Sequence, residues 1–455
     1  MSLFRNLAFG LTCFVAIIAT LTPALAQTSA TNSPYSRYGL GELANPETMQ
    51  AAAQGNTSTT YSNPYSINLS NPAALASMEM TAYEIGLNGS YSNFKDVQGA
   101  SGNVWNAGVS YLSLGFPLFN PLNEIGQRKK RAVHWGGAVG LVPFSTVAYN
   151  IQTTDSTGAL GSVTRAYIGK GSLYQAYGSV GVKYKDLSLG ATFGYVFGHL
   201  VYERDVLLNT VTQSLSDQFS DDIRVRGLNI RLGGQYEYVL SKRREDEDEQ
   251  AFRRRDKTRL VVGATLTPSI NYNVIASSRY TSTDYSTNGY PRDTAYYQSE
   301  TISPLRMPMQ YSVGLSLKKD NHYRVAVEYT AANWSEYNNP AKPETFTNTY
   351  TLRVGGEWIP DYKSFNSYAN RVAYRAGFYT GTDPRTFGAD RLTRTAVTLG
   401  LGLPLRLPRG LPSFINIGAE LGTFGNPNYV TEDYVRLNLG FTLNDNTWFY
   451  KPKFN

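Results

Sequence analysis

The sequence predicts an all-β fold, a transmembrane antiparallel β-barrel of about 14 strands with an N-terminal plug segment. Three observations predict it: an export signal at the N-terminus, many short segments in which apolar and polar residues alternate, and no apolar run after Gln27 that approaches the roughly 20 residues a membrane helix needs. A barrel strand of about ten residues shows only alternation, because one face meets lipid and the other meets the lumen.

The first 26 residues have the features of a signal peptide. Arg5 gives a short positive region, residues 7–21 are mostly apolar, and residues 24–26 form an A-x-A cleavage pattern, so we expect the mature chain to begin at Gln27. Cys13 is the only cysteine and lies within this segment. The mature chain is therefore expected to have neither a disulfide nor a cysteine metal site.

Composition supports strands and argues against a nucleic-acid partner. The chain has 455 residues, including 34 tyrosines, and tyrosine and β-branched residues are enriched in strands. The formal net charge of +7 indicates a mildly basic surface. An exported protein meets little nucleic acid, so this charge does not point to one as a partner.

The final segment shows the alternation most clearly. Every second residue from Val435 to Leu443 is apolar, whereas Arg436, Asn438 and Thr442 lie on the opposite face. The segment 226–240 repeats the pattern. We predict strands at 81–92, 106–118, 132–145, 173–184, 187–198, 226–240, 258–275, 309–318, 322–333, 348–359, 371–380, 394–404, 413–423 and 435–444.

Short and long connections alternate between these segments, as they do between the periplasmic and external sides of an outer-membrane barrel. The two-residue turn at 185–186 is assigned to the periplasm. The charged link 242–257 and the basic cluster 128–131 fall on the same side, as solvated loops or as docking sites for a partner. The predicted external connections are 146–172, 199–225, 276–308 and 381–393.

Aromatic and charged residues add two further indications of a barrel. Aromatic residues at both ends of the strands predict two interfacial girdles: Trp135, Tyr323 and Trp358 at the periplasmic end, and Tyr91, Tyr195, Phe197 and Trp334 at the outer end. Ionised residues in mid-strand predict a wet or plugged lumen rather than a packed soluble core. These lumen charges are Arg231, Glu237, Arg324, Glu328, Arg353, Glu357, Arg375 and Glu420.

We expect Glu328 and Arg353 to pair across adjacent strands, as bracing or as a cationic site for a ligand carboxylate. Catalytic motifs are scarce, and the histidines at 134, 199 and 322 lack metal-ligand spacing. A barrel enzyme with a Ser–His pair assembled across strands stays an alternative. The prediction is a protein that is not an enzyme, with no catalytic residues, no metal and no cofactor.

Residues 27–80 do not alternate. They begin with the turn-rich stretch 33–41, and a short helix is expected within 47–54. The segment is either a plug inside the barrel or a periplasmic arm. We favour the plug, because side chains alone do not fill a lumen of this width. The predicted organisation is a signal peptide at 1–26, a plug or hatch at 27–80 and a barrel at 81–455.

In architecture the chain resembles the FadL-type family of outer-membrane transporters for long-chain fatty acids and other hydrophobic compounds. The sharpest local match is Asn71-Pro72-Ala73, which looks like the NPA element of the family's hatch. The stretches 33–41, 140–145 and 448–451 look like a Bacteroidetes branch. The chain departs from proteobacterial barrels by ending at Asn455, beyond its last aromatic cluster.

The resemblance implies passive uptake of long-chain fatty acids or aromatic hydrocarbons by a barrel in the bacterial outer membrane. The partners implied are membrane lipid and a hydrophobic small molecule, and the barrel is expected to be a monomer. The alternative is a barrel without transport activity that acts as accessory partner or plug of a protein-secretion machinery.

The resemblance also implies an exit through the barrel wall at the third predicted strand. Pro143 cannot donate a ladder hydrogen bond, so it predicts a bulge, a bend or a local loss of pairing. The nearby glycines at 136, 137 and 140 permit another segment to approach closely. The resemblance implies that the NPA element packs beside this strand near 136–144. The candidate ligand and gate residues are Asn71, Pro72, Ala73, Gly140, Pro143 and Phe144.

Overall fold

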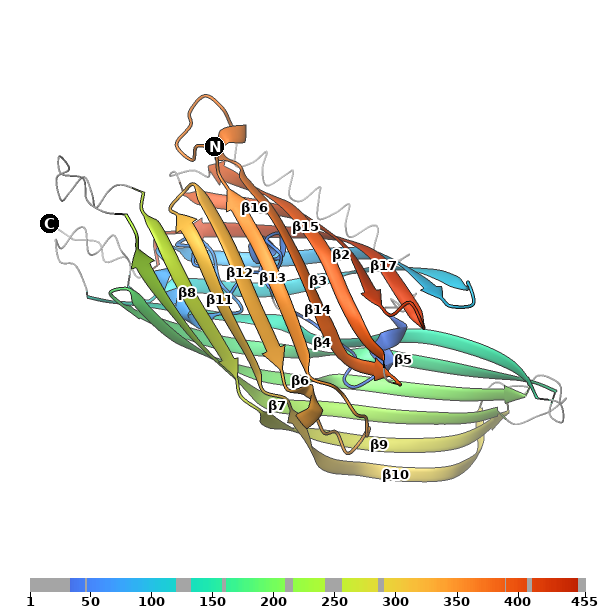
Figure 1. Cartoon of the computed structure of the whole chain (residues 1–455). Helices are drawn as coiled ribbons and strands as arrows, with labels where there is room; N and C mark the ends of the chain where they lie inside the picture. The colour runs from blue at the N-terminus through green and yellow to red at the C-terminus, as the bar shows by residue number, and fades with distance from the viewer. Residues whose placement is uncertain are drawn as a thin grey trace, which may run out of the picture.

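Strands dominate the computed structural model (Figure 1), which describes residues 33–45, 47–119, 132–157, 161–208, 216–241, 256–284, 290–388, 390–406 and 411–448. The expected signal peptide, the basic cluster 128–131, most of the charged link 242–257 and residues 449–455 lie outside the described residues.

The wall of the barrel is made of β2 to β17. Their bounds are β2 Thr81–Asp96, β3 Ser101–Pro117, β4 Val133–Thr157, β5 Gly161–Tyr184, β6 Leu187–Leu208, β7 Ser216–Val239, β8 Thr258–Thr267, β9 Ile270–Asp284, β10 Tyr290–Met307, β11 Gln310–Lys319, β12 Tyr323–Ala332, β13 Thr349–Trp358, β14 Ala373–Phe387, β15 Asp390–Arg406, β16 Pro412–Gly425 and β17 Val430–Asp445. Two short 3₁₀ helices follow wall strands, η4 Trp334–Glu336 and η5 Ala369–Arg371.

Antiparallel pairing closes these strands into a barrel, with β17 returning to β2 in the register Leu439–Leu87. Two paths through the wall are interrupted near prolines, β8–β9 at Pro268 and β10–β11 at Pro308. Proline lacks the N–H that a ladder needs. Strand β7 pairs with β8 along one part of its length and with β9 along another. The segments β8 and β9 therefore form one interrupted strand of the wall, as do β10 and β11, and each of these two paths counts once. The described wall therefore has 14 strands, which confirms the predicted fold class.

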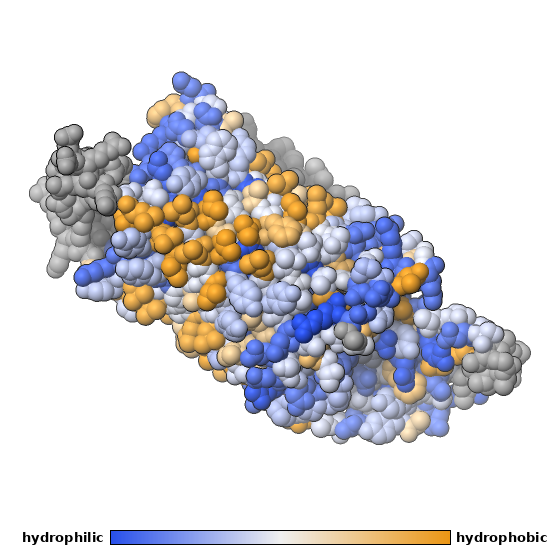
Figure 2. Space-filling model, in the orientation of Figure 1, coloured by the Kyte–Doolittle hydropathy of each residue, from blue (hydrophilic) through white to orange (hydrophobic). Residues whose placement is uncertain are grey.

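Apolar side chains are exposed on each of the 14 strands of the wall, counting β8–β9 and β10–β11 as one strand each. Figure 2 shows them gathered in a band on the visible face. A soluble monomer rarely exposes so large an apolar surface, whereas a barrel in lipid requires it. One exposed example from each path, in strand order from β2, is Tyr83, Leu112, Val139, Val180, Phe193, Leu232, Val262, Leu315, Val327, Leu352, Phe378, Leu399, Leu421 and Leu437.

The strands are much longer on one side than predicted. Strands β4 to β7 have 22 to 25 residues, whereas β8, β11, β12 and β13 have ten. The segments predicted as long connections are therefore largely strand. Backbone pairing continues there without a lipid-facing apolar row, and buried side chains such as Val147 and Leu200 form a core between these strands. We call this projecting sheet the flange, visible in Figure 1 beyond the barrel. It consists of residues 146–157, 161–172, 199–208 and 216–225 with β9 and β10.

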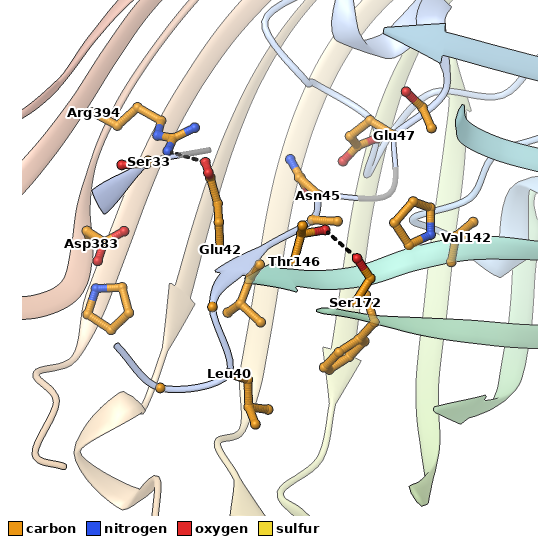
Figure 3. Close-up of a pocket in the computed structure, with 18 of the residues that line it drawn as sticks. Ser33, Leu40, Glu42, Asn45, Glu47, Val142, Thr146, Ser172, Asp383 and Arg394 are labelled. Carbon is orange, nitrogen blue, oxygen red and sulfur yellow. Dashed lines mark hydrogen bonds and ion pairs between the residues drawn. The ribbon is translucent and has the colours of Figure 1, made fainter. Parts of the chain in front are cut away.

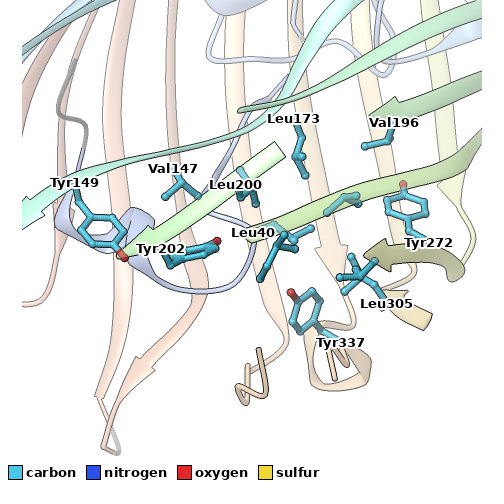
Figure 4. Packing of buried hydrophobic residues seen from close by; sticks show 13 residues of the cluster. Leu40, Val147, Tyr149, Leu173, Val196, Leu200, Tyr202, Tyr272, Leu305 and Tyr337 are labelled. Carbon is cyan, nitrogen blue, oxygen red and sulfur yellow. The ribbon is translucent and has the colours of Figure 1, made fainter. Parts of the chain in front are cut away.

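Residues 33–80, here called the inner segment, lie within the ring of wall strands. An arm, residues 33–45, contains η1 (Pro34–Arg37) and β1 (Glu42–Leu43). A body, residues 47–80, contains α2 (Met49–Ala52), which falls inside the predicted 47–54, and η2 (Pro72–Ser77). Figure 4 shows arm residue Leu40 packed among buried side chains of the flange, among them Leu200, Tyr202 and Leu305.

The predicted aromatic girdles are found in part. Trp135, Tyr323 and Trp358 are exposed at the end of the barrel with short turns. The assignment of Trp334 to the outer girdle is wrong. It begins η4, and its ring packs 5.7 Å from Tyr337, within a cluster that faces the flange core.

Candidate functional site

The body of the inner segment touches the wall at glycines. A Cβ added at Gly136 would clash with the carbonyl oxygen of Leu75, and one at Gly355 with that of Gln54. Ten wall glycines on ten strands, which we call the glycine belt, would each place a Cβ closer than 3.0 Å to the body. The belt comprises Gly115, Gly136, Gly181, Gly190, Gly233, Gly263, Gly355, Gly377, Gly400 and Gly440. The missing side chains leave room for the backbone of the body at most of these positions, and for side chains such as Ile67 and Met49 at the others.

The predicted Asn71-Pro72-Ala73 element lies one to three strands away from its expected place. Asn71 donates to the carbonyl oxygens of Thr59, at 2.7 Å, and Gly234, at 3.3 Å, and so faces β7. Pro72 and Ala73 contact belt glycines of β5 and β6. The residues that reach Gly136 on β4 are Leu75 and Ala76. At Gly136 the third barrel strand is thus met by the later residues of η2 rather than by Asn71-Pro72-Ala73.

Gly140 does not contact the inner segment as its sequence context suggested. The nearest atoms to a Cβ there belong to the wall residues Leu112, Ser113 and Tyr177. Of the glycines singled out on this strand, only Gly136 has the inner segment as a nearest neighbour of its added Cβ.

Two lumen charges predicted from the sequence, both on β12, hold the body. Arg324 donates to the side-chain oxygen of Gln54 at 2.8 Å, to both oxygens of Thr57 at 3.2 and 2.9 Å, and to Thr60 at 2.9 Å. Four residues further on, Glu328 accepts the backbone N–H groups of residues 58 and 59 at 2.9 and 2.8 Å. Both side chains are buried, so these bonds compensate for desolvation of the charges.

The other predicted lumen charges brace the wall and the body. Arg353 pairs with Glu328 at 3.0 Å in direct cross-strand register, which confirms the predicted pair. Arg375 pairs with Glu357 at 2.7 Å. Arg231 donates to the carbonyl oxygen of body residue 69 at 3.2 Å. The structure thus brings Arg324, Glu328 and Arg353 together and places Arg231 and Arg375 elsewhere on the wall.

The wall opens between β3 and β4. Pairing between these strands runs from Pro117–Gly136 to Leu112–Leu141 and stops there, although both strands continue. Each of the two strands has a bulge within three residues of this last pair. Strand β3 bulges at residue 110, in its pairing with β2, and β4 bulges at Phe144, in its pairing with β5. The proline-based expectation of a bulge with lost pairing near Pro143 therefore matches the geometry of β4. The resulting space is called the β3–β4 gap.

Strand β1 of the arm occupies the free edge of β4 at this gap. Glu42 and Leu43 pair with Thr146 and Ser145, and the N–H of residue 44 donates to the Phe144 carbonyl at 2.9 Å. Glu42 and Leu43 point to opposite sides, because successive side chains of a strand alternate. In Figure 3 Glu42 points across the lumen.

A cavity of about 970 Å³ lies above the body and beside the gap. Its lining joins arm residues to the walls of the barrel and to both sides of the gap. Beside the gap the lining includes the apolar residues Leu43, Val104, Val109, Val142 and Phe144, together with polar ones such as Asn106 and Ser110. The opposite side, on β14 to β17, is rich in charged groups. The lumen thus has room for an amphipathic small molecule.

Three arginines on the charged side, here called the arginine cluster, were not recognised in the sequence. They are Arg385, Arg394 and Arg436, and each pairs with an acid: Arg385 with Asp383 at 2.6 Å, Arg394 with Glu42 at 2.8 Å, and Arg436 with Glu420 at 3.4 Å. The alternation of β17 places Arg436 inward, but the pairing of β15 with the arm has no local sequence signal.

Two carboxyl groups of the inner segment face this cavity. Burial alone would raise the pKa of Glu42, but Arg394, Arg436 and Arg385 together lower it below its usual value. Burial, with a smaller contribution from Glu328, raises the pKa of Glu47 to about 7. Two serine hydroxyls of the body donate to Glu47 at 2.8 and 2.9 Å. Glu42 is therefore ionised at neutral pH, whereas Glu47 titrates there.

Within the described ranges, no helix is long and apolar enough to cross a membrane. Nor do the described residues contain a group of three or more histidine, cysteine, aspartate or glutamate side chains that could hold a metal ion.

Comparisons with known proteins agree with this geometry. The model of the BamG family matches residues 9–455. No curated protein matches the chain. Solved structures with the same fold include the Pseudomonas putida toluene transporter TodX (15% identity, 91% of this chain and 99% of that chain, TM-score 0.51) and the Ralstonia pickettii toluene transporter TbuX (14% identity, 92% and 99%, TM-score 0.51). The CymD monoaromatic hydrocarbon channel is similar too (14% identity, 87% and 96%, TM-score 0.51).

Proposed function

We propose, for a chain that belongs to the BamG family, that this barrel is a passive route by which hydrophobic small molecules enter the bacterial outer membrane. A ligand enters the cavity from the flange end and leaves sideways through the β3–β4 gap into lipid. The observation that carries this proposal is the end of β3–β4 pairing at Leu112–Leu141, directly beside the cavity.

The glycine belt supports a sideways exit over a straight path. The body lies against wall glycines on ten strands, so a route past it would have to break close backbone packing around the ring. The gap needs no such change in the body. Only the arm, through β1, lies across the free edge of β4.

The cavity lining favours ligands with an apolar body and an acidic head, such as long-chain fatty acids. Apolar residues gather beside the gap, and three arginines face them from β14, β15 and β17. Toluene transport by TodX and TbuX is a property of those proteins. For this chain, aromatic hydrocarbons are the second ligand class, and a single barrel is expected to act alone, as a monomer without a cofactor.

Deleting Phe144 tests the exit. Without the extra residue, β4 can pair with β5 without a bulge, and its edge can continue along β3. We expect cells that carry the deletion to lose uptake of radiolabelled oleate while the barrel keeps its heat-modifiable mobility on gels. The matched control is Phe144→Ala, which removes the same ring from the cavity lining but keeps the bulge, so it should retain more uptake than the deletion. Normal uptake by the deletion variant would exclude the β3–β4 gap as the exit.

Orientation is tested separately. The flange is proposed to face outward and the short turns to face the periplasm. A cysteine at Tyr297 on exposed β10 should react with an impermeant maleimide on intact cells, and one at Lys185 in the β5–β6 turn should not. The reverse pattern would overturn the direction of transport.

A second candidate function is that of accessory partner to a protein-secretion machinery. The flange favours it, because among the described residues β10 pairs along 290–305 only with β9, and β4 pairs along 147–157 only with β5. Free edges are sites where another chain can add a strand. A photo-crosslinker at Thr294, compared with one at lipid-facing Leu437, would capture a specific membrane-protein partner only if this function holds.

A further inference from the structure

We propose that Arg394 is the binding site for the acidic head of the ligand, and that the ligand opens the β3–β4 gap by displacing Glu42 from this arginine. The inference rests on the proposed function, because it assigns a trigger to the same exit. Arg394 is here a latch: it holds β1 at the gap until another carboxylate takes the place of Glu42.

The first observation is that the latch joins two parts of the molecule. Among the described residues, Arg394–Glu42 is the only ion pair between the inner segment and the wall. Both side chains face the cavity and are 24% and 26% exposed, so a ligand in the cavity can reach them. Figure 3 shows the pair spanning the space between β15 and β1.

The second observation is that Arg394 has contacts besides Glu42 that can hold it in place. Its guanidinium lies 4.5 Å from the ring centroid of Phe424 and 5.7 Å from that of Tyr434. Aromatic faces stabilise a cation and hold a planar guanidinium. The neighbouring Arg385 and Arg436 already have acids from the wall. Arg394 is thus the member of the cluster whose partner is exchangeable.

The exchange keeps Arg394 paired. One carboxylate leaves Arg394 and another arrives, so the charge in contact with the arginine is unchanged, while Glu42 moves into the water of the cavity and the cavity as a whole gains the single negative charge of the ligand. A ligand without a charge, such as an alcohol of equal chain length, cannot make the exchange. The site therefore selects amphipathic carboxylates over neutral hydrocarbons.

The third observation connects the latch to the gap. Besides Arg394, β1 is held by two backbone pairings with β4 and by the hydrogen bond from residue 44 to Phe144. The short ladder is too small to be stable alone. Leu43, on the opposite face from Glu42, is an apolar residue of the cavity lining. Release of Glu42 therefore frees the strand that covers the edge of β4, next to the apolar lining where the tail of the ligand lies.

Calorimetric titration of the purified full-length protein in nanodiscs tests the site, with sodium dodecanoate and 1-dodecanol as probes. We expect Glu42→Gln to tighten dodecanoate binding by up to about fivefold, because a partly exposed ion pair no longer competes. Arg394→Gln should weaken it at least about tenfold. Neither change should alter dodecanol binding. Lys170→Gln, which removes another cavity cation, paired with Glu203, is the matched control and should leave both affinities unchanged.

Hydrogen exchange tests the release. In the wild type, dodecanoate should speed exchange of the amides of residues 42–44, and dodecanol should not. Glu42→Gln should exchange fast without any ligand, while amides of residues 50–60 keep the wild-type rate. Unchanged dodecanoate affinity in Glu42→Gln, or slower exchange at 42–44 on adding dodecanoate, would overturn the latch.

The two proposals can fail independently. If the Phe144 deletion retains oleate uptake while the latch variants behave as expected, the exit is wrong and the anion site stands. If the deletion abolishes uptake while Glu42→Gln binds and exchanges like the wild type, the exit stands and the latch is wrong.

Discussion

The body and the arm of the inner segment lie in the same barrel but are held by different kinds of contact. The body rests backbone against backbone on the glycine belt and is grasped by buried Arg324 and Glu328. Among the described residues, the arm has only a two-residue backbone ladder with β4 and the hydrogen bond from residue 44, and it is otherwise held by side chains. Arg385 donates to the carbonyl of Tyr35 at 2.6 Å, and Tyr202 donates to that of Gly39 at 3.0 Å.

This difference indicates which part of the inner segment can move. The body cannot give up its contacts one at a time, because a displacement of the body in any direction brings it against a wall strand. Polar side-chain contacts at a cavity can be exchanged one at a time for water or ligand. We therefore expect motion to begin in the arm and the body to remain in place, and each of the following experiments bears on that division.

The largest effect is expected at the belt. Gly136→Ala places a Cβ against the carbonyl of Leu75 and should cost at least about 3 kcal/mol in the stability of the body. Gly178→Ala, whose added Cβ would meet nothing within 4 Å, should be nearly neutral. Urea unfolding with hydrogen exchange of residues 50–78 gives the comparison. Equal stability of the two variants would mean that the belt does not hold the body.

A slightly smaller effect is expected at Arg324. Arg324→Met removes four hydrogen bonds to the body and leaves their acceptors buried, at a cost of about 2–3 kcal/mol. The change should speed exchange of the amides of residues 54–60 and leave β1 unaffected. Arg279→Met, on the exposed flange, is the control and should change stability by less than about 0.5 kcal/mol. Faster exchange in the arm, with no change in residues 54–60, would contradict the expectation that Arg324 holds the body and not the arm.

Acidity should act on the body through Glu47. The pKa of Glu47 in the folded protein, about 7, is above its value in the unfolded chain. The contribution of Glu47 to the free energy of unfolding is therefore complete below about pH 4.5 and is lost as the pH rises through 7. Between pH 5.5 and 8 the body should lose about 2 kcal/mol. Hydrogen exchange of residues 47–60, corrected for intrinsic rates, measures this loss. Glu47→Gln should abolish it, and a pH dependence that survives this change would assign the effect to another group.

The smallest effect is expected in the arm. Ser36 accepts a hydrogen bond from the N–H of Ala148, on the free edge of β4, at 3.2 Å. Ser36→Ala should cost about 1 kcal/mol or less, confined to local opening of residues 33–45. Exchange at Ala148 should rise while global unfolding stays the same. A fall in global stability would show that arm and body unfold as one unit.

The sequence predicts the membrane-spanning wall well because lipid imposes a pattern on it. Outward residues such as Leu437 and inward ones such as Asn438 follow strict alternation. The flange was predicted as loops for the opposite reason. Residues 152–156 read Gln-Thr-Thr-Asp-Ser, polar on both faces, yet they pair in register with β5. Where water replaces lipid, pairing continues beyond the last buried apolar residues, such as Tyr149, without a hydrophobic signal.

The candidate site was predictable only where it depends on local chemistry. Pro143 predicts the disturbance of β4, and the cross-strand pair Glu328–Arg353 follows from adjacent strands with inward charges. The partner of Arg394 comes from the arm, 352 residues earlier in the chain, and alternation says nothing about such a contact. For the same reason the sequence misplaced Asn71, whose position depends on the path of the whole body.

The glycine belt also sets the order in which the chain can be assembled. The body precedes every wall strand in the sequence, and the seam between β2 and β17 joins the first and last of them. We therefore expect the body to be in place before that seam closes, because a folded body inserted afterwards would have to slide along wall strands that meet it at close distance in the belt. A chain whose seam closes first would be left with an empty barrel.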